Sequence, residues 1–316
     1  MATSGSVNFN VTRNDIIQAA ARRVHAIGRG VTMNADMVNN FAMALNAMVK
    51  SLQAEGVRVW THAEATLFPQ ASQAKYTLGP SSTDHCTQSY VTTQLAADAA
   101  DAASTITVDS ITGISSGDYI GIVVDDGSVH WTTVNGAPSG STITLTDALD
   151  DSASEDARVY AYTTKITRPL LITDARRHNV SDNRDISIRR ISRTDYQALP
   201  NKTSTGLANS LFYDPQLSDG YLYIWPVPDA VTEIVTFTWR RPIEDFDAAG
   251  DNPDLPQEWI AALQWNLALE MTAEYPVSDQ LYSRIERMAA RHLANVSGFD
   301  RDSEDIFVQP DLEGWD

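Results

Sequence analysis

The N-terminal fifth of the chain carries apolar residues at helical spacing. Thr12, a good N-cap residue with Asp15 three positions later, precedes a first stripe, and Asn34 precedes a second. The two stripes consist of Ile16, Ala20, Val24 and Ile27, and of Met37, Phe41, Leu45, Met48 and Leu52. Because only a short loop separates them, the pattern predicts helices over 14–27 and 36–55 that pack as an antiparallel hairpin.

Between Ser104 and Thr163 the hydrophobic period changes to two. The run Asp125-Asp126-Gly127-Ser128 is a strong tight-turn signal between two apolar alternations. Five short strands are predicted here, near 105–108, 119–124, 129–134, 142–145 and 159–162. Such spacing is typical of a small β-barrel or sandwich. The Ala/Asp-rich segment Leu95–Ala103 is interpreted as a linker or short helix that leads into this inserted module.

Strand-like and helical patterns alternate in the rest of the chain. Strands are predicted near 186–191, 211–213, 220–225 and 233–240. Pro256 and Glu258 open a helical region over 256–296 that Pro276 interrupts. After Gly298 no periodicity remains, and the acidic, apolar-studded end of the chain is too irregular to fold alone.

These patterns together predict an α+β fold with a helical-bundle core. The N-terminal hairpin and the long C-terminal helices would form the core, from which a β-module, a mixed β region and an extended tail depart. The predicted segments are 1–94 (hairpin and connection), 95–165 (inserted all-β module), 166–250 (mixed β and loop), 251–297 (helices that complete the core) and 298–316 (extended tail).

The charge balance restricts the partners. With 23 Lys and Arg against 41 Asp and Glu, the formal net charge is −18, so the mean field repels phosphate and a dedicated nucleic-acid binder is not expected. A surface past which DNA slides without adhering is compatible with this charge. No run of about 18 apolar residues exists, and the N-terminus lacks the features of a secretory signal. The single cysteine, Cys86, excludes an intramolecular disulfide, which suits synthesis in a reducing cytoplasm.

Catalytic motifs are not convincing, so no enzyme, cofactor or metal site is predicted. The segment Gly113–Gly117 matches the nucleophile-elbow pattern, but it links two strand-like runs and is better explained as a turn. The acidic loop 147–156 lacks calcium-loop spacing. Adjacent His85 and Cys86 would point to opposite faces of a strand. An acid/base pair of Glu258 and Glu274 is a weak alternative, because carboxylates are common near helix ends.

One basic cluster stands out against the acidic background. Its members are Arg168, Arg176, Arg177, Arg184, Arg189, Arg190 and Arg193, with Arg240 and Arg241 further on. Three interpretations remain open: local ion pairs with Asp174, Asp182, Asp185 and Asp195; contact with the acidic face of a neighbouring copy; and contact with DNA, which the net charge opposes. The first cluster, from 168 to 193, is therefore a candidate inter-subunit contact.

Several stretches, in order, resemble the head-to-tail adaptor proteins (tail accessory factors) of short-tailed, DNA-packaging bacteriophages. They are Ala19–Gly28, Leu45–Val49 running to Gly56 and Trp60, Tyr196–Lys202, Leu211–Gln216, Trp225–Pro228, Arg241–Phe246, Leu255–Trp259, Asn266–Ala268 with Glu274 and Tyr275, Ser297–Arg301 and Asp305–Pro310. Each motif is apolar periodicity with turn punctuation, and their order and number carry the resemblance across most of the chain. The β-module departs from the smallest members, which are mainly helical.

The resemblance implies a structural virion protein made in the bacterial cytoplasm and located at the head–tail junction. It would form a ring of twelve copies beneath the portal protein, extend the DNA channel, retain packaged DNA, let DNA pass without specific binding, and present a platform to downstream tail proteins such as a nozzle, hub, fibre or spike. No membrane contact is implied.

The C-terminal segment is predicted to dock on the portal protein. Its apolar residues have no period with which to pack in their own domain, so a partner is needed to cover them. The predicted docking residues are Phe299, Asp300, Arg301, Ile306, Phe307 and Val308. A frayed terminus is the competing interpretation.

The alternative function is a tail-tip adhesin or wall-degrading hydrolase with a carbohydrate-binding β-module. It requires an exposed aromatic platform made of Tyr119, Trp131, Tyr160 and Tyr162. Because these residues alternate with apolar partners, the pattern favours a place in the core.

Overall fold

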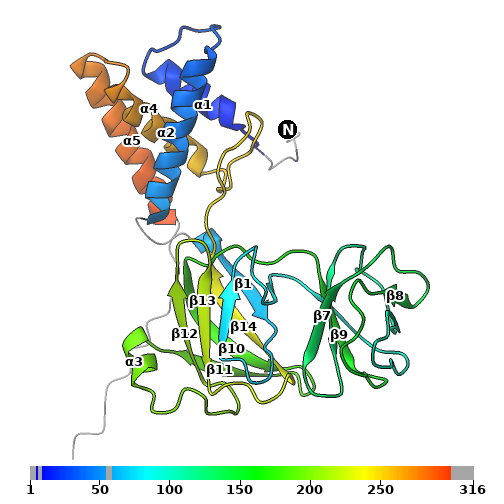
Figure 1. Ribbon diagram of the computed structural model, residues 1–316. Coiled ribbons are helices and arrows are strands. Elements are labelled where there is room, and N and C mark those ends of the chain that lie inside the picture. Colours follow the sequence, from blue (N-terminus) through cyan, green and yellow to red (C-terminus); the bar gives the residue numbers. More distant parts are fainter. Residues whose placement is uncertain (1–4, 6–8, 55–58, 300–316) are drawn as a thin grey trace, which may run out of the picture. The chain divides into compact units, whose positions relative to one another are not determined.

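A computed structural model describes residue 5 and residues 9–54 and 59–299 (Figure 1). The chain divides into two compact units, which we call the helical unit (Met1–Thr61 and Ile243–Asp316) and the β unit (His62–Pro242). The β unit is therefore an insertion between two parts of the helical unit.

The helical unit contains four α-helices around one apolar core. They are α1 (Arg13–Arg23), α2 (Ala35–Ala54), α4 (Trp259–Glu270) and α5 (Asp279–Phe299), with the short 3₁₀ turns η1 (Val59–Thr61) and η2 (Met271–Ala273). Thr12 and Asp15 form a complete capping box on α1, and the Asn34 side chain accepts a hydrogen bond from the Met37 amide at the start of α2. Phe41, Leu45 and Leu263 are fully buried between the helices. The caps and stripes expected for these helices are thus present.

The β unit is built on an eight-stranded sheet that curves into a nearly closed barrel, here called the large sheet. Its strand order is β2-β13-β12-β11-β10-β14-β1-β3. The strands are β1 (His62–Leu67), β2 (Lys75–Leu78), β3 (Cys86–Thr87), β10 (Leu171–Asn179), β11 (Arg184–Arg190), β12 (Ser210–Pro215), β13 (Gly220–Trp225) and β14 (Glu233–Arg240), and helix α3 (Arg193–Ala198) follows β11. Strands that precede and strands that follow the segment between β3 and β10 pair with each other: β1 runs antiparallel to β14, and β2 runs antiparallel to β13.

A second, smaller β assembly occupies the chain between β3 and β10. Its strands are β4 (Val91–Gln94), β5 (Thr105–Thr107), β6 (Tyr119–Val123), β7 (Val129–Thr133), β8 (Thr142–Thr144) and β9 (Arg158–Tyr162). The sheets β4-β9-β6-β7 and β5-β8 join through the bridges Leu95↔Val108 and Val134↔Leu145, which close the strands into a small barrel. Ile106, Ile122 and Val159 lie in its own apolar core. We call residues 91–162 the small barrel.

The predicted fold class is wrong. A helical bundle does not form the core of this chain, which is mostly β. Helices α1, α2, α4 and α5 make a separate unit, and the large sheet organises the rest of the described chain. The physical reason is long-range pairing. β1, β2 and β3 lie in the segment that was expected to connect the hairpin to the module; β1 pairs with β14 and β2 with β13, while β3 extends the sheet beside β1. Leu95 and Ala99, expected in a linker, are buried within the small barrel.

Candidate functional site

The arginine cluster predicted from the sequence lies mainly on two neighbouring strands of the large sheet. Arg176 and Arg177 belong to β10, and Arg184, Arg189 and Arg190 belong to β11. The two strands pair antiparallel and form a hairpin. We call residues 171–190 the arginine hairpin. Arg168 precedes it, and Arg193 begins α3.

The two arginines of β10 are neutralised within the fold. Arg176 contacts Glu64 of β1 at 2.8 Å and Asp185 of β11 at 3.5 Å, and the hydrogen bond to Glu64 raises the pKa of its guanidinium. Arg177 contacts Glu233 of β14 at 3.2 Å, and this pair is mostly buried, with 13% and 15% of the two side chains exposed. The charges of Arg176 and Arg177 are therefore balanced by acidic side chains of the same chain.

Of the arginines on β11 and α3, some contact groups of their own chain and others do not. Arg190 donates a hydrogen bond to the Ile172 carbonyl at 2.6 Å, and Arg193 forms an ion pair with Asp214. Arg184 and Arg189 are exposed, and no ion pair within 4.0 Å is found for either in the described part of the chain. Of the local partners considered from the sequence, Asp185 pairs as expected, whereas Glu64, Glu233 and Asp214 come from distant strands.

The predicted docking residues fall almost entirely outside the described part of the chain. Phe299 is the last residue of α5, and nothing is described of its side chain. Asp300, Arg301, Ile306, Phe307 and Val308 lie in 300–316, outside the described residues. Their role in portal docking stays a prediction.

The aromatic residues required for a carbohydrate platform are packed where the small barrel meets the large sheet. Tyr160 and Tyr162 are buried, and Phe68 lies against both rings, 4.9 and 6.2 Å away between centroids. Trp131 stacks on His85 at 3.9 Å. A Cβ atom on Gly121 would lie 2.7 Å from three atoms of the Trp131 ring, so the glycine backbone covers the opposite face. Both faces of the indole are therefore occupied.

His85 is held as a neutral ring inside this aromatic junction. Burial, with a smaller contribution from the nearby Lys165 charge, lowers the pKa of His85 to about 3. Its Nδ1 atom lies 2.6 Å from the Tyr162 hydroxyl. The imidazole therefore serves packing and hydrogen bonding at neutral pH, and burial raises the pKa of the neighbouring Cys86 thiol, which keeps it protonated.

The remaining candidates for chemistry have structural explanations. Gly113 and Gly117 adopt positive φ values of 82° and 86° in the connection between β5 and β6, as a turn requires. Glu258 and Glu274 flank α4 and η2, and the 12 residues of α4 alone span about 18 Å. A glycosidase pair lies about 5–9.5 Å apart, so these two carboxylates do not form one. Among the described residues, no group of three or more His, Cys, Asp or Glu side chains could hold a metal ion.

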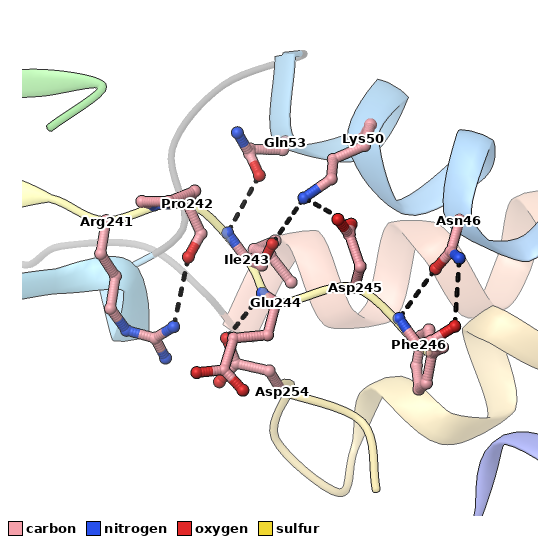
Figure 2. Close-up of polar contacts among 10 residues, drawn as sticks. All are labelled: Asn46, Lys50, Gln53, Arg241, Pro242, Ile243, Glu244, Asp245, Phe246 and Asp254. Carbon is pink, nitrogen blue, oxygen red and sulfur yellow. Dashed lines mark hydrogen bonds and ion pairs between the residues drawn. The ribbon is translucent and has the colours of Figure 1, made fainter. Parts of the chain in front are cut away.

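The point where the chain re-enters the helical unit is held by one face of α2 (Figure 2). Gln53 accepts a hydrogen bond from the Ile243 amide at 3.0 Å, and Lys50 donates one to the Ile243 carbonyl at 2.7 Å. Asn46 accepts from the Phe246 amide at 3.0 Å and donates to its carbonyl at 3.2 Å. Side chains at 46, 50 and 53 share a helix face, so they match an extended segment.

Additional contacts fix the same segment, 243–246. Lys50 forms an ion pair with Asp245 at 2.7 Å, and the Glu244 amide donates to Asp254 at 3.1 Å. Ile243 and Phe246 are buried in the core of the helical unit. The segment is thus held to α2 by its backbone and to the core by its side chains.

Comparisons with known proteins identify no family. No family model and no curated protein matches the chain. One solved structure, the Gp54 tailspike of Acinetobacter baumannii bacteriophage AP22 in complex with A. baumannii capsular saccharide, is 19% identical over 25% of this chain and 15% of the tailspike, with a TM-score of 0.22. At that TM-score the similarity carries no argument about fold or function. No described helix is long and apolar enough to cross a membrane.

Proposed function

We propose that this chain is a structural protein of a bacteriophage virion and acts as the adaptor between the portal and the tail. In this role it surrounds the DNA channel, helps to retain packaged DNA and presents a surface to tail proteins. The portal protein, neighbouring copies and tail proteins are its partners, and the neck of the virion is its location.

The observation that carries the proposal is where the resembling motifs come together. Parts of three stretches far apart in sequence, Leu45–Val49, Arg241–Phe246 and Leu255–Trp259, lie in the helical unit. Helix α2 holds the segment 243–246 through five polar contacts of Asn46, Lys50 and Gln53 (Figure 2). A further hydrogen bond joins the Glu244 amide to Asp254. The motifs Tyr196–Lys202, Leu211–Gln216 and Trp225–Pro228 lie in the β unit, so this support comes only from the motifs of the helical unit.

The charge of the chain supports the same role. A net charge of −18 disfavours tight binding of phosphate, which suits a channel through which DNA must pass. The predicted copy-to-copy contact through Arg168–Arg193 stays a prediction. Arg176, Arg177 and Arg193 pair with acidic side chains of their own chain, and Arg190 donates to a carbonyl, so this cluster has less free charge than its sequence indicates.

A tail-tip protein that binds carbohydrate is the second candidate, and one cavity favours it. A cleft of about 370 Å³ is lined by Phe68, Gln70, Asp84, His85 and Trp131, among others. Ligand sites commonly combine aromatic walls with a few polar groups. However, most polar and aromatic groups of this cleft already contact other parts of the same chain. Both ends of the Gln70 amide bond to the Val129 backbone, Asp84 accepts from the Thr77 amide, and both faces of Trp131 are covered. We therefore propose the adaptor first and keep the carbohydrate-binding tail protein as the alternative that the following experiment tests.

Mixing experiments separate the two candidates. The full chain should bind purified portal rings encoded by the same phage genome, and negative-stain microscopy should show added density at one end of the ring. A variant truncated after Gly298 should stay soluble and lose this binding if the terminal segment docks. Retention of binding by the truncated variant would place docking in the folded units. Binding of the full chain to host capsular polysaccharide, with none to portal, would refute the adaptor role and support the alternative.

A further inference from the structure

The helical unit carries a basic pocket beside the end of α1. A cavity of about 680 Å³ is lined by Arg22, Arg23, His25 and Arg29, together with Ala19, Ile27 and Gly28. The sequence explains this concentration of charge, because residues 16–35 contain three arginines and no Asp or Glu. We call this cavity the basic pocket.

The arginines of the basic pocket are positioned by uncharged partners. Arg22 donates a hydrogen bond to Gln18 at 2.9 Å, and Arg23 donates one to Gln264 at 2.8 Å. The Arg23 guanidinium also lies 4.6 Å from the centre of the Trp265 ring. These contacts fix the side chains and leave their positive charges uncompensated, unlike those of β10.

The basic residues of the pocket differ in exposure: Arg23 is partly buried, whereas Arg22, His25 and Arg29 are exposed. Burial lowers the pKa of Arg23, and the adjacent Arg22 adds to the effect, although an arginine stays protonated at neutral pH. In the part of the chain that the structure describes, neither these two arginines nor Arg29 forms an ion pair within 4.0 Å. Hydrogen bonds from Thr12, and to a smaller extent the Arg22 charge, lower the pKa of Asp15 on the same helix.

The dipole of α1 accounts for only part of the basic pocket. Arg22 and Arg23 lie in the last turn, where cations favour the negative end of the helix. His25 and Arg29 lie beyond the helix, and His25 adopts a positive φ of 58°. The dipole effect fades within the last turn, so it gives no reason for these two residues to line the same cavity.

The same chain offers a complementary surface on the small barrel. Between Tyr76 and Ala157 the sequence has no Lys or Arg and twelve Asp or Glu residues. Three loops bring several of them together, because Ser152 and Ser154 donate to Asp125 and the Glu155 amide donates to Asp98. The exposed acids of this surface are Asp98, Asp125, Asp126, Asp150, Glu155 and Asp156. We call it the acidic face.

We propose that the basic pocket of one copy binds the acidic face of a second copy. The two surfaces differ from each other, so the contact is heterologous and propagates from copy to copy, either closing into a ring or extending. Matching a local positive site to a strongly negative one also overcomes the repulsion between two chains of net charge −18. DNA phosphate would meet the same pocket, but it would also meet the repulsion of all the acidic surface around it.

This contact rests on the proposed function only because a ring of adaptors requires a contact between neighbouring copies. Portal binding without self-association would refute the contact between copies and leave the adaptor role standing. Self-association without portal binding would refute the adaptor role and leave the contact between copies standing.

The experiment is sedimentation velocity on the full chain with matched charge variants. The wild type should self-associate at about 0.02 M salt, and its dissociation constant should rise at least about tenfold by about 0.5 M, where screening shortens to a few Å. Arg22→Glu with Arg29→Glu should weaken association by more than about tenfold. Arg184→Glu with Arg189→Glu changes the net charge equally and should leave it within about twofold.

A charge swap makes the test specific. Glu155→Lys with Asp156→Lys reverses the acidic face at two of its exposed side chains, for which no side-chain hydrogen bond is found among the described residues, and it should also weaken association. Mixed with the pocket variant, it should restore association, because each carries the complement of the other. A wild type that stays monomeric throughout, or loss in the Arg184/Arg189 variant alone, would overturn the proposal. Binding of duplex DNA that only the pocket variant loses, without self-association, would also overturn it.

Discussion

Two regions of this molecule are rich in arginine, and they differ in the groups that contact the guanidinium charges. In the arginine hairpin, Arg176 and Arg177 reach Glu64, Asp185 and Glu233 of the same large sheet. In the basic pocket, Arg22 and Arg23 are held by the amides of Gln18 and Gln264. The hairpin has more arginines, whereas the pocket keeps more of its charge available. The density of arginine along the sequence is therefore a poor guide to how much positive charge a folded region leaves unpaired.

The β unit also holds His85 as a neutral ring, and the loss of stability on acidification should be the largest of the effects predicted here. In the unfolded chain His85 binds a proton below about pH 6.5, whereas in the folded protein its pKa is lowered to about 3 and it stays neutral above that pH. Stability should therefore rise with pH across this window, by about 1.4 kcal/mol per pH unit from His85, and be lost as the pH falls. Urea unfolding at several pH values measures this slope.

The variant His85→Phe supplies the control for that slope. It removes the titrating group and keeps a ring against Trp131, so the dependence between pH 4 and 6 should flatten by about 1 kcal/mol per pH unit, even if the overall stability falls. An unchanged slope would mean that the acid sensitivity of the β unit arises elsewhere.

Breaking the buried pair of the arginine hairpin should have the next largest effect. Arg177→Ala leaves Glu233 buried without its partner and should lower the free energy of unfolding by about 3 kcal/mol. The double variant Arg177→Ala with Glu233→Ala should recover part of this loss, because it leaves no isolated charge. A loss below about 0.5 kcal/mol in the single variant would contradict the neutralised state of the hairpin.

The more exposed pair should matter less. Arg176 has 33% and Glu64 61% of its side chain exposed, so Arg176→Ala should cost about 0.5–1 kcal/mol, and less at high salt. Arg184→Ala, with no ion pair to lose among the described residues, should stay within about 0.5 kcal/mol of the wild type. Equal costs for all three arginines would remove the distinction between paired and unpaired positions.

Local pattern predicted much of the secondary structure. The stripes and caps predicted α1 and α2, and the alternation with a tight turn at 125–128 predicted β6 and β7. In contrast, β10 was missed, since Leu171–Asn179 carries Asp, two Arg and His on a strand paired along both edges. Its charges are accommodated by ion pairs across the sheet, a condition that no local window contains.

Tertiary pairing explains why the fold class and the candidate site were harder to predict. β1 and β14 are separated by more than half of the chain, so hydrophobic period alone could not join them into the large sheet. The partners Glu64, Glu233 and Asp214 were missed for the same reason. The basic pocket had a readable signal, the absence of acids over 16–35, but the denser arginine cluster drew the interpretation elsewhere.

Arginine footprinting tests most directly which basic region meets a second copy. An arginine-selective dicarbonyl reagent is applied to the full chain at low and high protein concentration in low salt, and peptide mass spectrometry reports the modification of each residue. We predict that Arg22 and Arg29 lose reactivity as the chain associates, while Arg184 and Arg189 keep theirs. Protection of Arg184 and Arg189, with Arg22 and Arg29 unchanged, would contradict this account.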